Sequence, residues 1–444
     1  MTEILRDRVA RECAQGGPSG IARVETVIPC TDPLGWLRAQ DASGAKLYWA
    51  DRDGEHEVAG FGAADRVACA DVNGTELLFG QVRRRLEGAA PEARYFGGLR
   101  FSGKTPVDAA WREFDGCGFV LPRFELSRRG SDSVLACQWL RSTATADTLM
   151  AELDSLVFAA SENGRSHPSA TGRHDLPGRV GWDAAVTQTL DLVSKGDLDK
   201  VVLARKSTFG FADCLDPLAC LQALLPETER CYRFCFVLGA GRGFLGASPE
   251  RLYRRDGRRI LCDALAGTRT RGDGASLDRQ LEQDLMGSEK ERREQDYVVR
   301  DIRESLAPLC STLDAGADPS VMKLRNWQHL VSRFEGVLRA GVSDAELLKA
   351  LHPTPAVGGY PTGPALREIE KREPFDRGWY GGPVGWVGHD AAEFAVAIRS
   401  GLVDGSTLSV FAGAGIVAGS VPEDEWAELD YKIRHFTRAL NLPR

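Results

Sequence analysis

The sequence contains no long hydrophobic run, and no stretch approaches the length of a membrane-spanning helix. Its first residues, MTEILRDRVARECAQG, carry charges throughout and lack the apolar segment of a secretory signal peptide. These absences argue against a membrane protein or a secreted one. We therefore expect a cytoplasmic protein without a membrane partner.

Basic residues are not in excess either. The 444-residue chain has 56 lysines and arginines against 63 aspartates and glutamates, which gives a net charge of −7. This balance lacks the positive footprint of a nucleic-acid-binding protein, so we expect no nucleic-acid partner. A single pocket can still be positive and bind an anionic ligand.

Cysteine and histidine show no metal-binding pattern. None of the eleven cysteines forms a C-x-x-C pair, and the seven histidines have no spacing typical of zinc ligands. We interpret the cysteines as reduced, mostly buried thiols. The length allows one large domain or two to three smaller ones.

The most informative stretch is Leu408–Phe436, which predicts a strand, a glycine loop and a helix. Gly413, Gly415 and Gly419 are expected to bracket a turn where the backbone approaches a ligand closely. The helix that follows would direct free N–H groups toward that turn. Such a helix start is a suitable site for an anion.

Ser420 is the expected N-cap of this helix, with Glu423 completing a capping box and Pro422 in the first turn. One side of the helix is predicted to face a core. The other side carries Glu425, Glu428 and Lys432. This charged stripe is either solvated or part of a site in which carboxylates and a cation neutralise each other.

Other segments show clear helix or strand patterns. The first 160 residues favour antiparallel strands and hairpins. The polar segment Ser161–Gly181 is the best candidate for a linker. Helices are predicted at Gly74–Leu86, Thr145–Ser161, Trp182–Lys195, Leu277–Ala307 and Gly363–Lys371, and a strand at Phe394–Arg399.

Two charged residues stand at the ends of apolar strands. Lys200 starts the strand that runs to Lys206, and Glu250 follows Pro249 in a turn. A lysine in this position is either an ordinary polar strand end or a buried amine that acts as a base. Gly241–Gly246 formally matches G-x-G-x-x-G, but no helix follows it, so we reject a dinucleotide site.

Ordered motifs make residues 180–440 similar to the chorismate-utilising enzymes. This family includes isochorismate, salicylate and anthranilate synthases and aminodeoxychorismate synthase component I. The motifs, in family order, are KVVLAR (200–205), GASPERL (246–252), ALAGTRTRG (264–272), EKERREQ (289–295), LHPTPAVGGYP (351–361), EPFDRGWYGGPVGW (373–386), IRSG (398–401) and FAGAGIVAGSVPEDEWAE (411–428).

The resemblance implies an α+β fold: one large chorismate-binding α/β sandwich with mainly antiparallel sheets flanked by helices. Residues 1–165 would be a β-rich part that completes the fold, and residues 175–440 the catalytic region. The form HPTPA, with Ala356 where salicylate and anthranilate synthases tend to have threonine, implies isochorismate synthase, and FGGLRF (96–101) and FVLPRFEL (119–126) resemble its menaquinone type. A salicylate synthase, an ammonia-using synthase and a non-catalytic chorismate-binding protein are the alternatives.

The resemblance also assigns roles. Lys200 would be the base that activates water, and Glu250 the acid that protonates the departing 4-hydroxyl. These two roles call for a lowered lysine pKa and a raised glutamate pKa. Glu294 and Glu428 would bind Mg2+, with Glu425 supporting its water ligands.

The resemblance further implies that no amidotransferase subunit is needed and that the protein is a monomer serving menaquinone, siderophore or salicylate synthesis.

Substrate contacts follow from the same resemblance. The implied contacts to chorismate or isochorismate are Arg399, Tyr380 and Lys432 at the enolpyruvyl carboxylate, Gly413, Ala414 and Gly415 through their backbone, Gly267 and Thr268 at the ring carboxylate, and Ala356 and His352.

Overall fold

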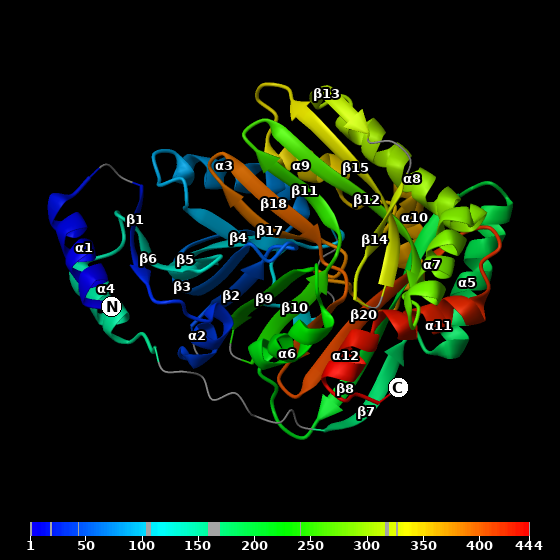
Figure 1. Cartoon of the computed structure of the whole chain (residues 1–444), viewed down its shortest axis with the longest axis horizontal. Coiled ribbons are helices and arrows are strands. Elements are labelled where there is room, and N and C mark those ends of the chain that lie inside the picture. Colours follow the sequence, from blue (N-terminus) through cyan, green and yellow to red (C-terminus); the bar gives the residue numbers. More distant parts are fainter. Residues whose placement is uncertain are drawn as a thin grey trace.

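The computed structural model describes residues 2–17, 20–42, 44–103, 108–158, 169–239, 241–315, 319–325 and 327–443. Twenty strands in these ranges are connected in one continuous network of pairings, each of them antiparallel. One end of the molecule holds the helices α5 (Arg179–Ser194), α7 (Ala275–Gly287), α8 (Glu289–Leu306), α10 (Thr362–Arg372) and α11 (Pro422–Lys432) (Figure 1). The other end holds α1 (Thr2–Gln15) and α4 (Ala146–Asp154). The predicted α+β class with mainly antiparallel sheets is confirmed.

Strands from the first 140 residues pair directly with strands from the second half of the chain. The central strand β2 (Lys46–Ala50) pairs with β9 (Tyr232–Gly239), and β4 (Arg94–Leu99) pairs with β17 (Pro383–Gly388). The division into residues 1–165 and 175–440 stays a prediction, and residue 165 lies outside the described ranges. The other early strands are β1 (Ile21–Ile28), β3 (His56–Cys69), β5 (Cys117–Arg129) and β6 (Asp132–Leu140).

The predicted linker 161–181 is wrong in its second half. Residues Ala170–Leu176 form strand β7, which pairs with β8 (Lys200–Phe211), and helix α5 begins at Arg179. The polar residues of β7 concealed its strand character because this edge strand is only partly buried. The first half of the linker, including His167, lies outside the described residues.

The long helix predicted at 277–307 is two helices, α7 (Ala275–Gly287) and α8 (Glu289–Leu306). Between them Ser288 takes an extended conformation and its hydroxyl caps α8 by accepting a hydrogen bond from the Glu291 N–H. The glycine before the serine ends the first helix, and the serine starts the second. The helix predicted at 145–161 is also shorter, because α4 covers Ala146–Asp154.

The stretch 408–436 differs from the prediction in its glycines and its cap. Strand β20 (Thr407–Ile416) includes Gly413 and Gly415, and only Gly419, with φ +90°, lies in the turn. Val421 precedes α11 (Pro422–Lys432) as its N-cap, while the Ser420 hydroxyl accepts a hydrogen bond from the Val417 N–H. The capping box predicted for Ser420 is therefore wrong, and the serine instead closes the loop between strand and helix.

The remaining elements complete the sheet and its cover. The helices are α1 (Thr2–Gln15), α2 (Pro33–Ala39), α3 (Thr75–Leu86), α5 (Arg179–Ser194), α6 (Pro217–Leu224), α9 (Asp344–Leu351), α10 (Thr362–Arg372) and α12 (Arg434–Ala439). The strands are β10 (Arg242–Ser248), β11 (Arg251–Asp256), β12 (Arg259–Thr270), β13 (Cys310–Ala315), β14 (Ser320–Lys323), β15 (Trp327–Leu338), β16 (Gly359–Tyr360), β18 (Ala391–Val396) and β19 (Ser400–Asp404).

The core contains a dense aromatic cluster beneath the strands that carry the site. Trp111, Phe114, Phe244 and Trp379 pack edge-to-face, with ring centroids 5.2–6.3 Å apart. Such packing fixes the strands above it because each buried ring contacts several others. Strand β10 is part of this layer, so the rejected G-x-G-x-x-G motif is indeed sheet rather than a helix start. None of the described helices is long and apolar enough to cross a membrane.

Candidate active site

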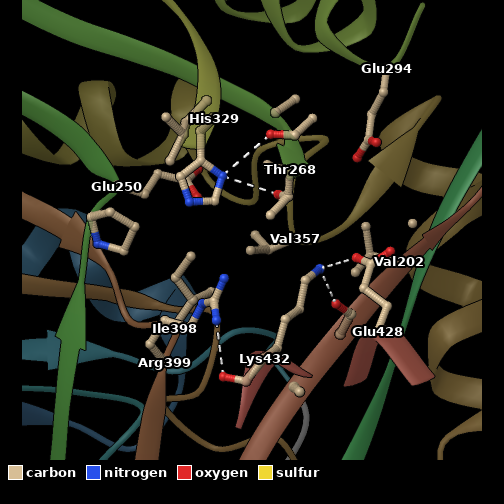
Figure 2. Close-up of a pocket in the computed structure, with 18 of the residues that line it drawn as sticks. Val202, Glu250, Thr268, Glu294, His329, Val357, Ile398, Arg399, Glu428 and Lys432 are labelled. Carbon is tan, nitrogen blue, oxygen red and sulfur yellow. Dashed lines mark hydrogen bonds and ion pairs between the residues drawn. The ribbon is translucent and has the colours of Figure 1, made fainter. Parts of the chain in front are cut away.

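A cavity lies between the strands β8, β12 and β20 and the helices α8 and α11. Figure 2 shows Glu294 and Glu428 on one side of it, with Glu250, His329 and Arg399 toward the other. The predicted site residues that line this cavity are Glu250, Gly267, Thr268, Glu294, Ala356, Tyr380, Arg399, Gly413, Gly415, Glu425, Glu428 and Lys432.

Three predicted site residues do not line the cavity. Lys200 is completely buried directly behind Glu294, to which its ammonium group is paired. Ala414 is buried in β20 between two lining glycines, because alternate residues of a strand face opposite sides. His352 lies elsewhere and is partly buried, with Nε2 3.1 Å from the carbonyl oxygen of Phe101.

Lys200 begins strand β8 and its side chain has no exposure to solvent. Its Nζ atom donates a hydrogen bond of 2.7 Å to Oε1 of Glu294 on helix α8. Gly415 on the adjacent strand makes room for this pair, since a Cβ atom there would lie 2.9 Å from Lys200 Cε and 3.1 Å from Glu294 Oε1. A side chain at this position would therefore displace the pair.

Glu250 is the clearest acid in the cavity. Burial raises its pKa to about 8, and the charge of Asp263 adds to that rise against the opposing effect of Lys200. A carboxyl group with this pKa is largely protonated at neutral pH and has a proton to donate. Ser248 fixes the turn locally, because its hydroxyl accepts a hydrogen bond from the Glu250 N–H.

Four carboxylates come from two helices that face the same cavity. Glu291 and Glu294 are three residues apart on α8, and Glu425 and Glu428 are three apart on α11. This spacing places each pair on one face of its helix. Each of them pairs with a cation: Glu428 with Lys432 and Glu294 with Lys200 at 2.7 Å, Glu425 with Lys290 at 3.2 Å, and Glu291 with Arg269 at 3.4 Å.

Burial and mutual repulsion act on these carboxylates even though each has a cationic partner. Burial raises the pKa of Glu291, and the charges of Glu294 and Glu428 raise it further. Burial also raises the pKa of Glu425, again with a contribution from Glu428. Burial acts in the same direction on Glu428, but the ammonium of Lys432 lowers its pKa overall.

A divalent cation fits this arrangement. Among the described residues no three histidine, cysteine, aspartate or glutamate side chains are close enough to form a complete metal cage. Mg2+ does not require one, because it retains several waters and usually takes one or two protein carboxylates together with the substrate. Glu294 and Glu428, one from each helix, are carboxylates of the appropriate type.

Cationic and aromatic groups also line the cavity. Nζ of Lys432 donates a hydrogen bond of 2.7 Å to the carbonyl oxygen of Gly413, and the ring of Tyr380 stacks on Phe411 with centroids 5.1 Å apart. Arg399 donates a hydrogen bond of 3.0 Å to the carbonyl oxygen of Lys432. These groups suit a substrate carboxylate.

The strand predicted at 394–399 ends earlier, because β18 stops at Val396. Arg399 follows it with φ +53°, a left-handed conformation that is uncommon for arginine. The side chain therefore leaves the sheet and points into the cavity (Figure 2). The chain turns here so that a guanidinium group, rather than a strand end, lines the site.

Gly267 shapes the wall of the cavity beside Thr268 and His329. It has φ +61° and forms a bulge in β12 between Ala266 and Thr268. The bulge brings the Thr268 hydroxyl to 3.0 Å from Nδ1 of His329. Burial, followed by the positive charge of Arg399, lowers the His329 pKa to about 3, so the imidazole is neutral.

Two charged residues of the cavity, Lys290 and Glu291, were not among the predicted site residues. Their charge run EKERRE resembles an ordinary solvated helix face, which concealed them. The available signal was the repeated spacing, since Glu291 precedes Glu294 by the same three residues that separate Glu425 from Glu428.

The antiparallel α+β fold surrounds a cavity lined by a buried acid and cationic groups beside a buried lysine, a combination that suits acid–base chemistry on an anionic ligand. The chain belongs to the chorismate binding enzyme family, which it matches over residues 8–441. The isochorismate synthase MenF of Bacillus subtilis (strain 168) is 30% identical to it, and the match covers 94% of this chain and 93% of that protein.

Two further similarities extend the comparison. The chloroplastic isochorismate synthase of Catharanthus roseus is 35% identical, and the match covers 81% of this chain but only 64% of the plant protein's length. The solved structure of MenF from Escherichia coli, described as the menaquinone-specific isochorismate synthase, superimposes with a TM-score of 0.88. It is 30% identical, with 99% of this chain and 98% of that chain covered.

Proposed function

We propose that this protein is an isochorismate synthase that interconverts chorismate and isochorismate with the help of Mg2+. The observation that carries this proposal is that one site combines an acid with a candidate base. Burial raises the pKa of Glu250 to about 8, and Lys200 is hydrogen-bonded to Glu294 at the edge of the same cavity. The similarity to named isochorismate synthases over almost the whole chain supports the same activity.

In the forward reaction, Lys200 in its unprotonated form, with its amine turned from Glu294 into the cavity, takes a proton from water as the water oxygen bonds to the ring carbon next to the carboxylated one. The ring double bonds shift, and the bond between C4 and its hydroxyl oxygen breaks. Glu250 gives its proton to the departing hydroxyl, which leaves as water. The net reaction consumes one water and releases one, and proton exchange with solvent restores both groups.

Glu294 and Glu428 would hold the metal ion, with Glu425 bonded to its waters. When bound, Mg2+ would neutralise the ring carboxylate and offset charge that shifts during the reaction. Gly267 and Thr268 would position that end of the ring. The proposed contacts for the enolpyruvyl carboxylate are Arg399, Lys432, Tyr380 and the backbone of Gly413–Gly415.

We further propose that the enzyme acts in the cytoplasm as a monomer, without an amidotransferase subunit, and serves menaquinone synthesis. The similarity to a menaquinone-specific enzyme supports this pathway. The methyl group of Ala356 lines the cavity and offers no hydroxyl. This feature favours hydration of the ring over the alternatives that release pyruvate or add ammonia.

The direct test is incubation with chorismate and Mg2+, with and without ammonium, followed by chromatography of the products. Isochorismate in equilibrium with chorismate, lost on addition of EDTA and unaffected by ammonium, is the expected result. Salicylate with pyruvate, or an aminated product, would replace this proposal with another activity of the family. Saturable chorismate binding without turnover would identify a binding protein.

The metal assignment has its own test in the variant Glu428→Gln. Removing one anionic ligand should weaken Mg2+ binding by about tenfold or more, measured by titration calorimetry. Glu423→Gln is the matched control, because Glu423 lies exposed on the same helix. Equal Mg2+ affinities in the two variants would remove Glu428 from the metal site.

A further inference from the structure

A second cavity, of about 530 Å3, adjoins the active-site cavity. The two share Pro249 and Arg399 in their walls, so Arg399 contributes to both. The second cavity is bordered by the chain after β12, the start of β15, and the helices α11 and α12. Its volume is within the range of about 300–1,000 Å3 that is usual for small-molecule sites.

Positive charge dominates the walls of this second cavity. Three carboxylate residues also line it, Glu227, Glu229 and Asp273. Arg325 pairs with Glu229 at 3.5 Å, and Arg271 pairs with Asp278 at 2.6 Å. The lining arginines are Arg271, Arg325, Arg399, Arg434 and Arg438.

The other three arginines form no ion pair with a carboxylate in the described ranges. Arg399 lies over the ring of Trp327, with its guanidinium carbon 4.9 Å from the ring centroid, and Arg434 lies 5.3 Å from that of Tyr431. The two rings contact each other edge-to-face at 6.2 Å. Cations and aromatic rings thus form a continuous row from the active site to the second cavity.

A buried polar atom in the same wall also lacks a partner. His435 lines the second cavity and is 8% exposed, and its Nε2 atom has no hydrogen-bond partner among the described residues. Buried polar atoms are nearly always hydrogen-bonded, so this nitrogen calls for a ligand or a water. The cavity therefore has unpaired cations and an unsatisfied ring nitrogen.

We propose that the second cavity is a vestibule in which the dicarboxylate substrate binds before Arg399 passes it to the active site. This inference rests on the proposed function, because chorismate carries two carboxylates. Arg434 and Arg438 capture the first carboxylate from solvent. A cleft lined by one sign of charge concentrates oppositely charged ligands and accelerates their association.

The test compares Arg434→Gln/Arg438→Gln with a matched control, Arg83→Gln/Arg84→Gln. The control removes the same charge from exposed positions on α3, which lies far from α12 (Figure 1). At low salt, kcat/KM for chorismate should fall about fivefold in the vestibule variant, with a much smaller change in kcat. At roughly 0.5 M salt the difference from wild type should disappear, because the charges are then screened.

Identical kcat/KM and salt dependence in the two double variants would overturn the vestibule. A lower kcat at an unchanged association rate would instead assign the cavity to a regulatory anion, and would also overturn it. The association rate of chorismate is measured separately by stopped-flow tryptophan fluorescence, with Trp327→Phe identifying the signal from the vestibule wall.

The stopped-flow measurement of chorismate association distinguishes a failure of the vestibule proposal from a failure of the proposed function. Chorismate that binds wild type without turnover would refute the proposed function, while the association rates would still test the vestibule. Chorismate that does not bind wild type at all would refute both.

Discussion

Nζ of Lys200 and Oε1 of Glu294 are 2.7 Å apart, although one residue begins strand β8 and the other lies on helix α8. The proposed base and a proposed metal ligand thus share a direct hydrogen bond. Because the same carboxylate would serve an ammonium group and a metal ion, binding of the ion should change the electrostatic environment of the base.

Replacing Lys200 with alanine should reduce kcat by about 10²–10⁴-fold, the usual contribution of a general base. Chorismate and Mg2+ binding should remain largely intact, because Arg399, Lys432 and Glu428 are unchanged. Steady-state kinetics and titration calorimetry measure the two effects. The exposed Lys195→Ala is the control for a lost lysine, and full activity in Lys200→Ala would exclude Lys200 as the base.

Activity should decline as the pH rises through about 8, because Glu250 then loses the proton it must donate. Glu250→Gln should remove this limb of the pH profile along with most of kcat, since an amide cannot act as an acid. Profiles of kcat between pH 6 and 10 measure the effect. If the residual activity of Glu250→Gln still declines above about pH 8 as in wild type, the decline must come from the titration of another group.

Folding stability provides a test of Glu250 that does not depend on turnover. The folded pKa of about 8 exceeds the ordinary value of 4.5, so the unfolded chain releases this proton first as pH rises. Wild type should lose up to about 1.4 kcal/mol per pH unit between these values relative to Glu250→Gln. If wild type and Glu250→Gln differ in free energy of unfolding by the same amount at pH 5 and at pH 8, the carboxyl group is not buried in its neutral form.

Gly415→Ala should separate the Lys200–Glu294 pair without replacing either residue. The new methyl carbon would lie 2.9 Å from Lys200 Cε, so the ammonium group must move. A displacement near 1 Å at a reacting group costs about 10²-fold in rate. Gly172→Ala is the control, because that position has open space around it. A kcat of Gly415→Ala equal to that of Gly172→Ala would mean that the Lys200–Glu294 pair adapts to the methyl group.

A fragment of residues 161–444 should be insoluble or inactive. It lacks β2 and β4, so strands β9 and β17 would each expose an edge that is paired in the whole protein. Expression of the fragment beside the full chain, followed by size-exclusion chromatography and a chorismate assay, measures this. A soluble and active fragment would show that residues 1–160 form a separable domain.

The sequence predicts which residues form the site better than it predicts the backbone conformation around them. The motifs identify Lys200, Glu250, Glu294 and Glu428; the three glutamates line one cavity, and Lys200 lies behind it, hydrogen-bonded to Glu294. The role of each residue stays a prediction. His352 shows the limit, because a motif residue can also lie against a backbone carbonyl away from the cavity.

Backbone details depended on contacts that local patterns do not encode. Gly413 and Gly415 are typical of a loop, yet β8 pairs with them across ten registered positions and keeps them in a strand. The polar residues of β7 are likewise held extended by pairing with β8. Arg399 adopts a left-handed conformation that no propensity favours, since the site requires its side chain in the cavity.

The pairing of β4 with β17 affects how the protein is made. Roughly 280 residues separate the two strands, and a ribosome needs roughly 15–60 s to add them at 5–20 residues per second. Throughout that interval β4 has emerged without its second partner. Until β17 is made, this edge of β4 in the nascent chain lacks its partner, and exposed strand edges of this kind promote aggregation.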